Sequence, residues 1–275
     1  YNLYYMNSID GKVAVITGSS MGIGKALAIE MAQRGARVVL NGRDKTRLDE
    51  THQMLLDNGY DVTAISGDVS NFNDCEKLIE HTLKSYGKID YLINNAGLSA
   101  EGEIEKMQPD LFKKIIDVNY LGSIFPTKVA LPYIKASKGS ILFISSLAAI
   151  HGLPEYSAYC SSKMALTAVA ESLKTELSGT GVHVGIAYLG FIQNDPNKKV
   201  YKANGELEVI PIREGVKVQP VKNTAHRLIK MIENRTYKLT FSTIGKLLLF
   251  LNRFTPMLLE QFFYYSYKKK KDGKG

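Results

Sequence analysis

Short apolar segments alternate with longer amphipathic segments along most of the chain. Each apolar segment is a continuous run that ends in small or polar residues, which is typical of strands buried on both faces of a sheet. The segments between these runs have the apolar spacing of helices and several end in glycine. The apolar runs lie in residues 12–18, 37–43, 62–70, 89–97, 139–146 and 182–190. Alternating strands and helices predict an α/β fold: a single doubly wound domain whose parallel sheet is covered on both faces.

The same pattern divides the chain into one domain and two flanking segments. We expect the domain to cover residues 10–241, after an N-terminal extension of residues 1–9. Within the domain, residues 194–220 show no periodicity, and an irregular stretch of that length is usually a lid or disordered. We interpret residues 194–220 as a substrate lid. Residues 242–275 are amphipathic again and predict a helical, polybasic tail.

Charge changes this picture only at the tail. The net charge is +8, but five lysines lie in the last residues from 268 on, and without them it would be +3. A nearly neutral domain argues against a nucleic-acid partner. Two cysteines and five histidines show no metal-ligand spacing, so we expect no metal and a reducing, cytoplasmic location. No basic segment precedes an apolar run near residue 1, so we expect no signal peptide.

A glycine-rich loop joins the first predicted strand to the first predicted helix. It reads TGSSMGIG over residues 17–24, with glycines at 18, 22 and 24. Glycine lets the backbone turn tightly and approach a ligand, and the helix that follows offers N–H groups to an anion. Because the loop lies between a strand and a helix, we favour a pyrophosphate-binding turn over a glycine turn without a ligand.

Tyr159 and Lys163 are candidates for proton transfer. They are four residues apart on a predicted helix, so their side chains share a face and the ammonium group would favour the ionised phenol. This spacing alone is weak support, because three tyrosines of the tail also precede a lysine by four residues. Tyr159 differs from these three tyrosines because Ser146, the last residue of a predicted strand, lies thirteen residues before it.

The TGxxxGIG loop, the NNAG segment at 94–97, Ser146 and the YxxxK pair together resemble the short-chain dehydrogenase/reductase family over residues 10–241. Within it the chain resembles the branch of 3-ketodihydrosphingosine reductases and 11β-hydroxysteroid dehydrogenases. The resemblance implies a Rossmann fold and hydride transfer with a nicotinamide cofactor. The catalytic residues that it implies are Asn119, Ser146, Tyr159 and Lys163.

The resemblance also implies a role for each of these residues. Tyr159 would protonate the carbonyl oxygen of the substrate, and Ser146 would hydrogen-bond the same oxygen. Lys163 would contact the nicotinamide ribose, and Asn119 would hold a water that connects Lys163 to solvent. We expect Ser146, Tyr156 and Tyr159 to contact the substrate.

The end of the second predicted strand indicates which cofactor binds. A carboxylate is usual there in NAD-binding sites, whereas this chain has Gly42 followed by Arg43. A guanidinium can pair with a 2′-phosphate, and we read Asp44 as the start of the next helix, so we expect NADPH/NADP+. The cofactor-binding residues expected from the loop, from Arg43 and from the resemblance are Gly18, Ser20, Met21, Gly22, Ile23, Gly24, Arg43, Asp68, Val69, Asn95, Ala96, Gly97, Tyr159, Lys163, Gly190 and Ile192.

One departure from the family concerns the segment after the sixth predicted strand. Members commonly have Pro-Gly there and a threonine near the cofactor amide, whereas this chain has Leu189-Gly190 and then Asn194. The glycine is kept, whereas the threonine common in the family is not found in this segment, "YLGFIQND".

The expected function is NADPH-dependent reduction of a ketone to a secondary alcohol on a hydrophobic substrate, lipid-like as in 3-ketosphinganine or a steroid. One alternative is an NADP-dependent alcohol dehydrogenase with a soluble substrate. Another is a non-catalytic Rossmann protein that senses the cofactor. By resemblance, helices around 104–132 and 156–179 would assemble a homodimer or homotetramer.

The tail supports the hydrophobic substrate. Its longest apolar run, residues 247–251, is far too short to cross a bilayer, and Thr255-Pro256 predicts a break between two short helices. Their apolar faces would either pack on protein or lie in an anionic membrane surface, with tyrosines at the headgroups and lysines on the lipid. We favour the second reading for residues 243–275, which would make the protein peripheral at the inner face of a membrane.

Overall fold

Strands form where the sequence has continuous apolar runs, and they assemble into one parallel sheet. The computed structural model describes residues 9–193, 195, 198–210 and 218–273. Its central sheet has seven strands in the order β10-β7-β6-β4-β1-β2-β3, all paired in parallel. The strands are β1 (Val13–Ile16), β2 (Arg37–Gly42), β3 (Val62–Ser66), β4 (Tyr91–Asn94), β6 (Ser140–Ser146), β7 (His183–Leu189) and β10 (Lys238–Thr240). The predicted doubly wound parallel sheet is confirmed.

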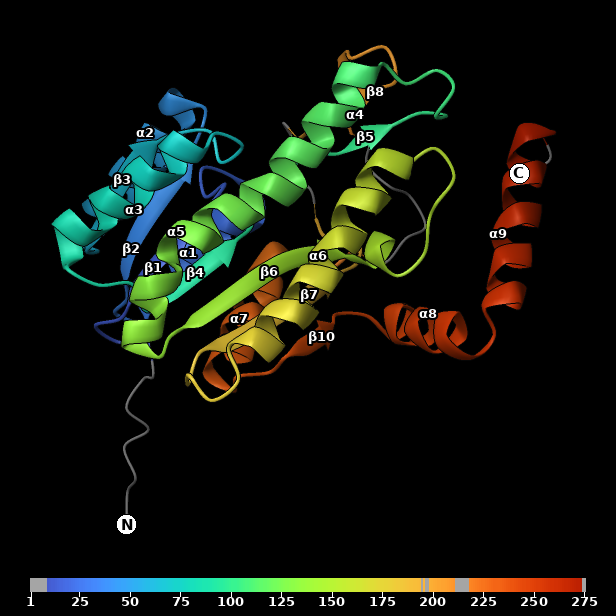
Figure 1. Ribbon diagram of the computed structural model, residues 1–275. Coiled ribbons are helices and arrows are strands. Elements are labelled where there is room, and N and C mark those ends of the chain that lie inside the picture. Colours follow the sequence, from blue (N-terminus) through green and yellow to red (C-terminus); the bar gives the residue numbers. More distant parts are fainter. Residues whose placement is uncertain (1–8, 194, 196–197, 211–217, 274–275) are drawn as a thin grey trace.

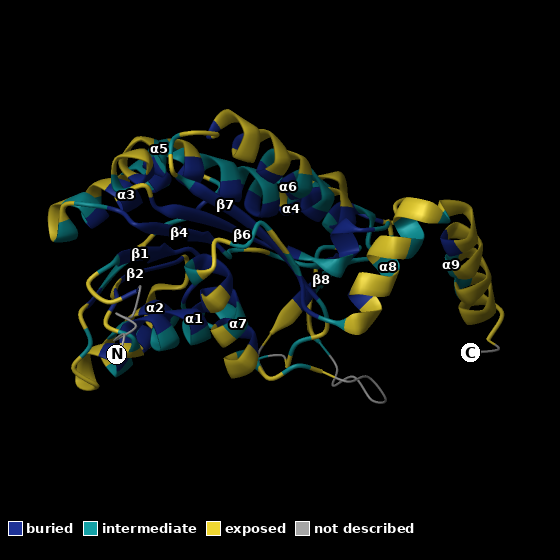
Figure 2. Cartoon of the chain, turned by 90° about the horizontal axis from the view of Figure 1, so that it is seen from below, coloured by how far each residue is buried: buried dark blue, intermediate teal, exposed yellow. Residues whose placement is uncertain are grey.

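Helices cover both faces of this sheet (Figures 1 and 2). Alternate strand residues point to opposite faces: Ile16 packs with the first hydrophobic cluster, and Val15 with the second. The first cluster joins the sheet to α1 (Gly22–Gln33), α2 (Lys45–Asp57) and α7 (Val221–Glu233). The second joins it to α3 (Phe72–Tyr86), α5 (Gly122–Ser137) and α6 (Ser157–Glu176).

The chain runs outward from the centre of the sheet in two directions. From β1 it proceeds through β2 to β3, then returns to β4 beside β1 and continues through β6 and β7 to β10. The switch between β1 and β4 separates the loops that follow these strands, and doubly wound sheets bind ligands at such a point. The short edge strand β10 has only one buried residue, Thr240, and its sequence did not predict a strand.

The long helix before β6 differs from its predicted bounds. It runs over residues 109–137 as α4 (Pro109–Ile116), a π-helical turn (Asp117–Leu121) and α5. The predicted range 104–132 was therefore wrong by about one turn at each end, because Pro109 begins the helix and Lys138, with φ of 53°, ends it. The other predicted helix, 156–179, corresponds to α6, preceded by a short 3₁₀ turn (Leu147–Ala149).

Part of the expected lid is regular structure. Strands β8 (Lys199–Lys202) and β9 (Leu207–Val209) form an antiparallel hairpin within the range 194–220. Strand β8 also pairs in parallel with β5 (Ala100–Glu101), which makes a second, three-stranded sheet. The expectation of irregular chain was thus wrong for this hairpin. Asn194 and residues 196–197 and 211–217 lie outside the described residues.

The tail forms two helices that project beyond the sheet (Figure 1). They are α8 (Thr243–Phe254) and α9 (Pro256–Lys271), so the predicted break at Thr255-Pro256 is confirmed. Most of their surface is exposed, as Figure 2 shows, including many apolar side chains. Within the part of the chain that the structure describes, no helix is long and apolar enough to cross a membrane.

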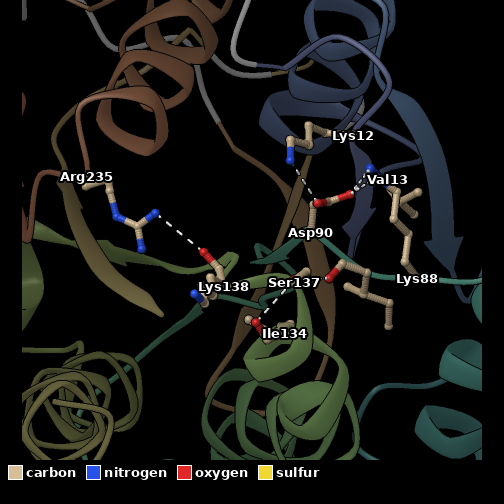
Figure 3. Close-up of polar contacts among 9 residues, drawn as sticks. Lys12, Val13, Lys88, Asp90, Ile134, Ser137, Lys138 and Arg235 are labelled. Carbon is tan, nitrogen blue, oxygen red and sulfur yellow. Dashed lines mark hydrogen bonds and ion pairs between the residues drawn. The ribbon is translucent and has the colours of Figure 1, made fainter. Parts of the chain in front are cut away.

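A charge cluster ties the amino ends of the central strands together (Figure 3). Asp90 is only 3% exposed, and its carboxylate accepts the Val13 N–H at 2.9 Å. Lys12 and Lys88 pair with it at 3.2 and 3.0 Å. Burial opposes ionisation of Asp90, but the hydrogen bonds from Val13, Lys88 and Lys12 hold its pKa below the usual value. This cluster joins β1 to the start of β4 at the edge opposite the candidate site.

Candidate active site

Parallel pairing brings the loops that follow β1, β4 and β6 to one edge of the sheet. Ile16 pairs with Ile93, and Asn94 pairs with Phe143, so these strands end at similar levels. The glycine-rich loop, the NNAG segment and Ser146 therefore meet at the carboxyl edge.

The glycines of the loop are needed for close backbone contacts. Gly18 has φ of 63°, and a Cβ there would lie 2.8 Å from the Cα of Ala96. A Cβ on Gly24 would lie 2.2 Å from the carbonyl oxygen of Gly18. Gly22, with φ of 57°, instead faces open space. Gly18 and Gly24 are thus required by close backbone contacts, whereas Gly22 is favoured only by its left-handed backbone conformation.

The loop leads directly into the N-terminus of α1. Met21 is the N-cap residue and makes no side-chain cap hydrogen bond, and the first turn contains no acidic side chain. The first N–H groups of a helix have no partner within it, so this end can receive an anion. The residues present therefore fit a pyrophosphate. Ser20, Ile23 and Gly24 complete this turn, with Ile23 packed against the first hydrophobic cluster.

The Asn95 side chain fixes the backbone of the glycine-rich loop by hydrogen bonds. Its side-chain amide donates to the carbonyls of Thr17 and Gly18 at 2.9 and 3.0 Å. The Thr17 hydroxyl in turn accepts the N–H groups of Asn95 and Ala96 at 3.0 and 3.1 Å. The Asn95 side chain is thus hydrogen-bonded to the backbone of the glycine-rich loop. Sequence reasoning did not single out Thr17, although it is the first residue of the quoted motif.

Arg43 and Asp68 lie together at the end of β2. Arg43 Nη1 is 3.3 Å from Asp68 Oδ2, and both side chains are partly exposed. Burial opposes ionisation of Asp68, but hydrogen bonds from Ser70 and the Arg43 guanidinium keep its pKa below the usual value. The neighbouring Val69 is buried, and its side chain would meet a Cβ on Gly122 at 2.6 Å.

Asp44 is the N-cap residue of α2, as its interpretation as a helix start required. Its carboxylate accepts the Arg47 N–H at 3.1 Å. The Arg47 guanidinium reaches the sulfur of Met21 at 3.1 Å, so a second cation lies beside the glycine loop. Sequence reasoning missed Arg47; its place one turn into the helix after Arg43 was the available signal.

Asn119 occupies the π-helical turn between α4 and α5 and is fully buried. Its Oδ1 accepts the Leu98 N–H at 2.7 Å, and its Nδ2 donates to the Leu98 carbonyl and to Ser162 Oγ, both at 2.9 Å. Ser162 Oγ donates to the Tyr159 carbonyl at 2.7 Å. Asn119 therefore links the segment after β4 to the first turns of α6. Single π-helical turns inside helices are frequent at functional sites.

Lys163 is a buried cation beside this network. It is 5% exposed, and its Nζ donates to the Ile144 carbonyl of β6 at 3.0 Å. Burial, and next the charge of Lys198, lower the pKa of Lys163 to about 8. A Cβ on Gly97 would lie 3.3 Å from Asn119 Oδ1 and 3.4 Å from Lys163 Nζ. Gly97, Asn119 and Lys163 thus meet at one point.

Tyr159, Ser146 and Tyr156 lie at the start of α6 and the end of β6, all of them partly buried. Tyr159 and Lys163 are one turn apart on α6, so their side chains share a face. Ser146 Oγ accepts the Ala148 N–H at 3.2 Å and caps the 3₁₀ turn. Its hydroxyl hydrogen can still be donated. Burial opposes ionisation of Glu101 of β5, but Lys202 and then Tyr156 keep its pKa below the usual value, and the sequence did not suggest that Tyr156 and Glu101 interact.

Gly190 and Ile192 follow β7. A Cβ on Gly190 would lie 3.4 Å from Leu147 and 3.5 Å from Ser242, at ordinary contact distance. Ile192 forms a bridge with Gln219 and packs against the first hydrophobic cluster. The Gln219 side chain donates to the Phe241 carbonyl at 2.7 Å, so this segment is joined to the start of the tail.

Comparison with known proteins agrees with this fold and with the placement of the motifs. The model of the family "short chain dehydrogenase" matches residues 12–205. The chain therefore belongs to the short-chain dehydrogenase family, whose members are oxidoreductases with a nicotinamide dinucleotide-binding fold. The resemblance stated from the sequence is confirmed.

Two curated relatives are informative. The 11-beta-hydroxysteroid dehydrogenase 1A of Arabidopsis thaliana is 36% identical over 223 residues, which are 80% of this chain and 64% of the relative. The 3-dehydrosphinganine reductase of Danio rerio is 37% identical over 186 residues, 66% of this chain and 56% of the relative. The match thus spans less than two thirds of the length of either relative.

Solved structures share the fold at lower identity. A short chain dehydrogenase/reductase from Burkholderia phymatum in complex with NAD superposes with a TM-score of 0.80 at 24% identity, covering 91% of this chain and 96% of that one. An alcohol dehydrogenase from the archaeon Thermococcus sibiricus, complexed with 5-hydroxy-NADP, gives 0.74 at 24% identity, covering 86% and 98%. Similarity at this level establishes the fold alone.

Proposed function

We propose that this protein reduces a ketone to a secondary alcohol with NADPH, on a hydrophobic substrate. The observation that carries the proposal is the buried Lys163, one turn after Tyr159 and next to Asn119 and Gly97. Among the described residues, no carboxylate pairs with this lysine. An unpaired buried cation destabilises a fold, so its presence is better explained by chemistry than by structure.

The glycine-rich loop and the N-terminus of α1 would hold the pyrophosphate of the cofactor, whose reduced nicotinamide would supply the hydride for the carbonyl carbon. Tyr159 donates its phenolic proton to the carbonyl oxygen, and the ammonium of Lys163 stabilises the phenolate that remains. Ser146 donates its hydroxyl hydrogen to the same oxygen and lowers the cost of the charge that develops there. Asn119 fixes the first turns of α6 through Ser162, and with them the position of Tyr159.

The central test is Tyr159→Phe, which keeps the ring and removes the proton. We expect kcat to fall by roughly two or more orders of magnitude, while the Kd for NADPH stays within about twofold. Tyr188→Phe, on β7 and hydrogen-bonded to Thr167, removes a hydroxyl elsewhere and is a matched control. Full activity in Tyr159→Phe would remove Tyr159 from its role.

The preference for NADPH rests on Arg43. Its guanidinium lies at the end of β2 and pairs with Asp68. The next residue, Asp44, is acidic, but its carboxylate caps α2. Arg47 and Ser20 flank the same corner of the glycine loop. We expect NADPH to bind at least about tenfold tighter than NADH, and Arg43→Ala to erase most of that difference. Equal Kd values for the two cofactors in the wild type would refute this preference.

The hydrophobic substrate is supported by the names of the relatives and by the tail. The Arabidopsis relative is named for a hydroxysteroid and the zebrafish relative for 3-dehydrosphinganine, both of them lipids. The two tail helices expose apolar side chains that include Leu247, Phe254, Met257, Leu258 and Phe262. We propose that these side chains lie in an anionic membrane surface, close to the entrance of the site.

Liposome flotation tests the membrane proposal separately from catalysis. Full-length protein should float with vesicles of phosphatidylcholine and phosphatidylserine at low salt, and a chain that ends at residue 242 should not. Circular dichroism must show that the shorter chain is folded. If the full-length protein ignores these vesicles, the exposed faces serve another purpose. Assembly into a homodimer or homotetramer is a further proposal, and a monomer in light scattering would refute it.

A further inference from the structure

Three glutamates outside the candidate catalytic residues lie around the start of α6. Glu101 belongs to β5, Glu103 follows it two residues later, and Glu155 directly precedes Tyr156. The backbone joins them: the Gly102 N–H donates to the Glu155 carbonyl at 2.7 Å. Residues 101–103 and the loop before α6 are therefore one unit.

Helix α9 binds this unit through its last turns. The Tyr267 hydroxyl donates to Glu103 Oε1 at 2.6 Å, and Lys271 Nζ lies 2.7 Å from the same oxygen. Lys270 Nζ lies 2.5 Å from Glu155 Oε2. Hydrogen bonds from Lys106, Lys271 and Tyr267 lower the pKa of Glu103 to about 2, so the carboxylate is ionised at neutral pH.

Two contacts nearer the middle of the tail reach the same loop. Phe263 of α9 stacks on the His151 ring, with centroids 4.9 Å apart and an angle of 13° between the planes. His151 Nδ1 also lies 3.3 Å from Asn252 Oδ1 of α8. The tail thus holds the loop of residues 151–156 at both of its ends.

Glu101 connects this loop to the hairpin of the expected lid. Its carboxylate pairs with Lys202 of β8 at 2.9 Å. Lys202 and then Tyr156 keep the pKa of Glu101 below its usual value, against the effect of burial. Glu101 therefore interacts with both the hairpin and Tyr156, while α9 binds Glu155, the residue before Tyr156.

The loop needs such support because of its backbone. Glu155 has φ of 67°, a left-handed conformation that side chains other than glycine adopt at a cost of about 1 kcal/mol or more. A residue in this conformation persists when its surroundings hold it. Here the Gly102 N–H and the Lys270 ammonium bind the two ends of the residue, its carbonyl and its carboxylate.

We propose that Lys270, Lys271 and Tyr267 are positioning residues: through Glu103 and Glu155 they hold the loop of residues 151–156, and with it Tyr156, where the ketone binds. This proposal rests on the proposed function for the role of Tyr156, whereas the holding of the loop stands on the contacts alone. It gives the tail a task at the site that is distinct from membrane binding.

The lysines of α9 separate the two tasks. Lys270 and Lys271 pair with glutamates, whereas Lys268 and Lys269 form no ion pair with any residue that the structure describes. All four side chains are exposed on the same last turns. Removing either pair changes the net charge equally, so both changes should weaken binding to anionic vesicles alike. Only removal of Lys270 and Lys271 should release the loop.

The experiment compares Lys270→Gln/Lys271→Gln with the control Lys268→Gln/Lys269→Gln in the full chain. Amide hydrogen exchange is measured over residues 99–103 and 151–157. We expect exchange there to rise by about fivefold or more in the first variant and to stay unchanged in the control. Lys270→Arg/Lys271→Arg keeps the ion pairs and should restore protection. Equal exchange in the two glutamine variants would overturn the proposal.

Kinetics with 2-dodecanone in detergent micelles tests the consequence at the site. The KM should rise about fivefold in Lys270→Gln/Lys271→Gln, with kcat and the Kd for NADPH within about twofold of the wild type. A faster-exchanging loop with an unchanged KM would overturn the positioning role. If the wild type reduces no ketone, the proposed function fails, and the exchange comparison still decides whether α9 holds the loop.

Discussion

The two edges of the central sheet differ in the number of charged groups that surround a buried ionisable side chain. At the amino edge, Asp90 is surrounded by Lys12, Lys88 and the Val13 N–H, which together keep it ionised (Figure 3). At the carboxyl edge, Lys163 is equally buried, but among the described residues its ammonium group donates to a single carbonyl oxygen, that of Ile144, and its pKa falls to about 8. Breaking a compensated buried charge pair costs stability, whereas an uncompensated buried charge itself lowers stability and is a candidate for chemistry.

The largest effect is expected from Lys163→Met. Activity should fall by roughly two or more orders of magnitude, because the cation that stabilises the Tyr159 phenolate is lost. The free energy of unfolding of the cofactor-free protein at pH 7 should not fall, and it can rise by up to about 3 kcal/mol, the equivalent of lowering the pKa from 10.5 to about 8. Urea unfolding and steady-state kinetics measure the two effects. A loss of stability like that of a core truncation would contradict the interpretation.

Asp90→Asn should have the opposite profile. It removes a charge-assisted hydrogen bond to Val13 and two ion pairs, so the free energy of unfolding should fall by about 1–3 kcal/mol. Turnover should stay within about twofold, since Asp90 lies at the far edge of the sheet. Asp49→Asn, which breaks an exposed pair with Lys45, is the control and should change stability by less than about 0.5 kcal/mol. A loss of activity without a loss of stability would reverse the assignment of the two edges.

The two charges should also differ in the pH window where they act. The pKa of Lys163 is lowered in the folded chain, so the unfolded chain binds more protons between pH of about 8 and 10.4, and stability rises with pH there. The pKa of Asp90 is lowered too, so its contribution is present above about pH 3.9 and is lost as pH falls through its folded value.

Urea unfolding of the wild type and Lys163→Met at several pH values isolates the first window. The stability advantage of the variant at pH 7 should shrink as pH rises from about 8 to 10.4. Reductase activity of the wild type should decline over the same rise, as Lys163 loses its proton. A difference in stability that does not vary with pH would show that Lys163 keeps the same charge throughout.

The exposed ion pairs of α9 should give the smallest effect and respond to salt rather than pH. Glu103 has a pKa of about 2, so its contribution is present above the usual value near 4.3 and is lost as pH falls toward 2. Between about pH 5 and 8, ionisation of Glu103 should therefore contribute no change to the hydrogen exchange of residues 151–157. In about 1 M NaCl, where the Debye length is about 3 Å, this exchange should increase. Salt-independent exchange would show that the ion pairs of α9 do not hold the loop.

Much of the fold could be predicted because the relevant signals are local. Continuous apolar runs mark β1, β2, β4, β6 and β7, since strands covered on both faces must be apolar on both. The glycine-rich loop was also identified from a local signal, because glycine readily adopts the positive φ that Gly18 and Gly22 have. The break between α8 and α9 follows from Pro256, which lacks an N–H.

The elements that escaped prediction depend on partners distant in the chain. Strand β10 forms because β7 offers an edge, and the β8–β9 hairpin because β5 pairs with β8 across about 100 residues. Asn119 was expected to hold a water, and that role stays a prediction; its bonds to Leu98 and Ser162 follow only from the meeting of three segments. The lysine-rich end of the tail was read as a lipid contact, and its pairing with Glu103 and Glu155 was not foreseen.

By itself the sequence determined the α/β class and the family, and it singled out the glycine-rich loop and the candidates Ser146, Tyr159 and Lys163, because each depends on spacing along a single strand, loop or helix. Only the tertiary structure decided which charges are compensated. Lys88 lies two residues before Asp90 in the sequence, but Lys12 and the Val13 N–H reach Asp90 only because β1 pairs beside β4, and among the described residues no carboxylate is brought to Lys163 in the same way. Electrostatic environment is a property of the assembled fold, so no local pattern reports it.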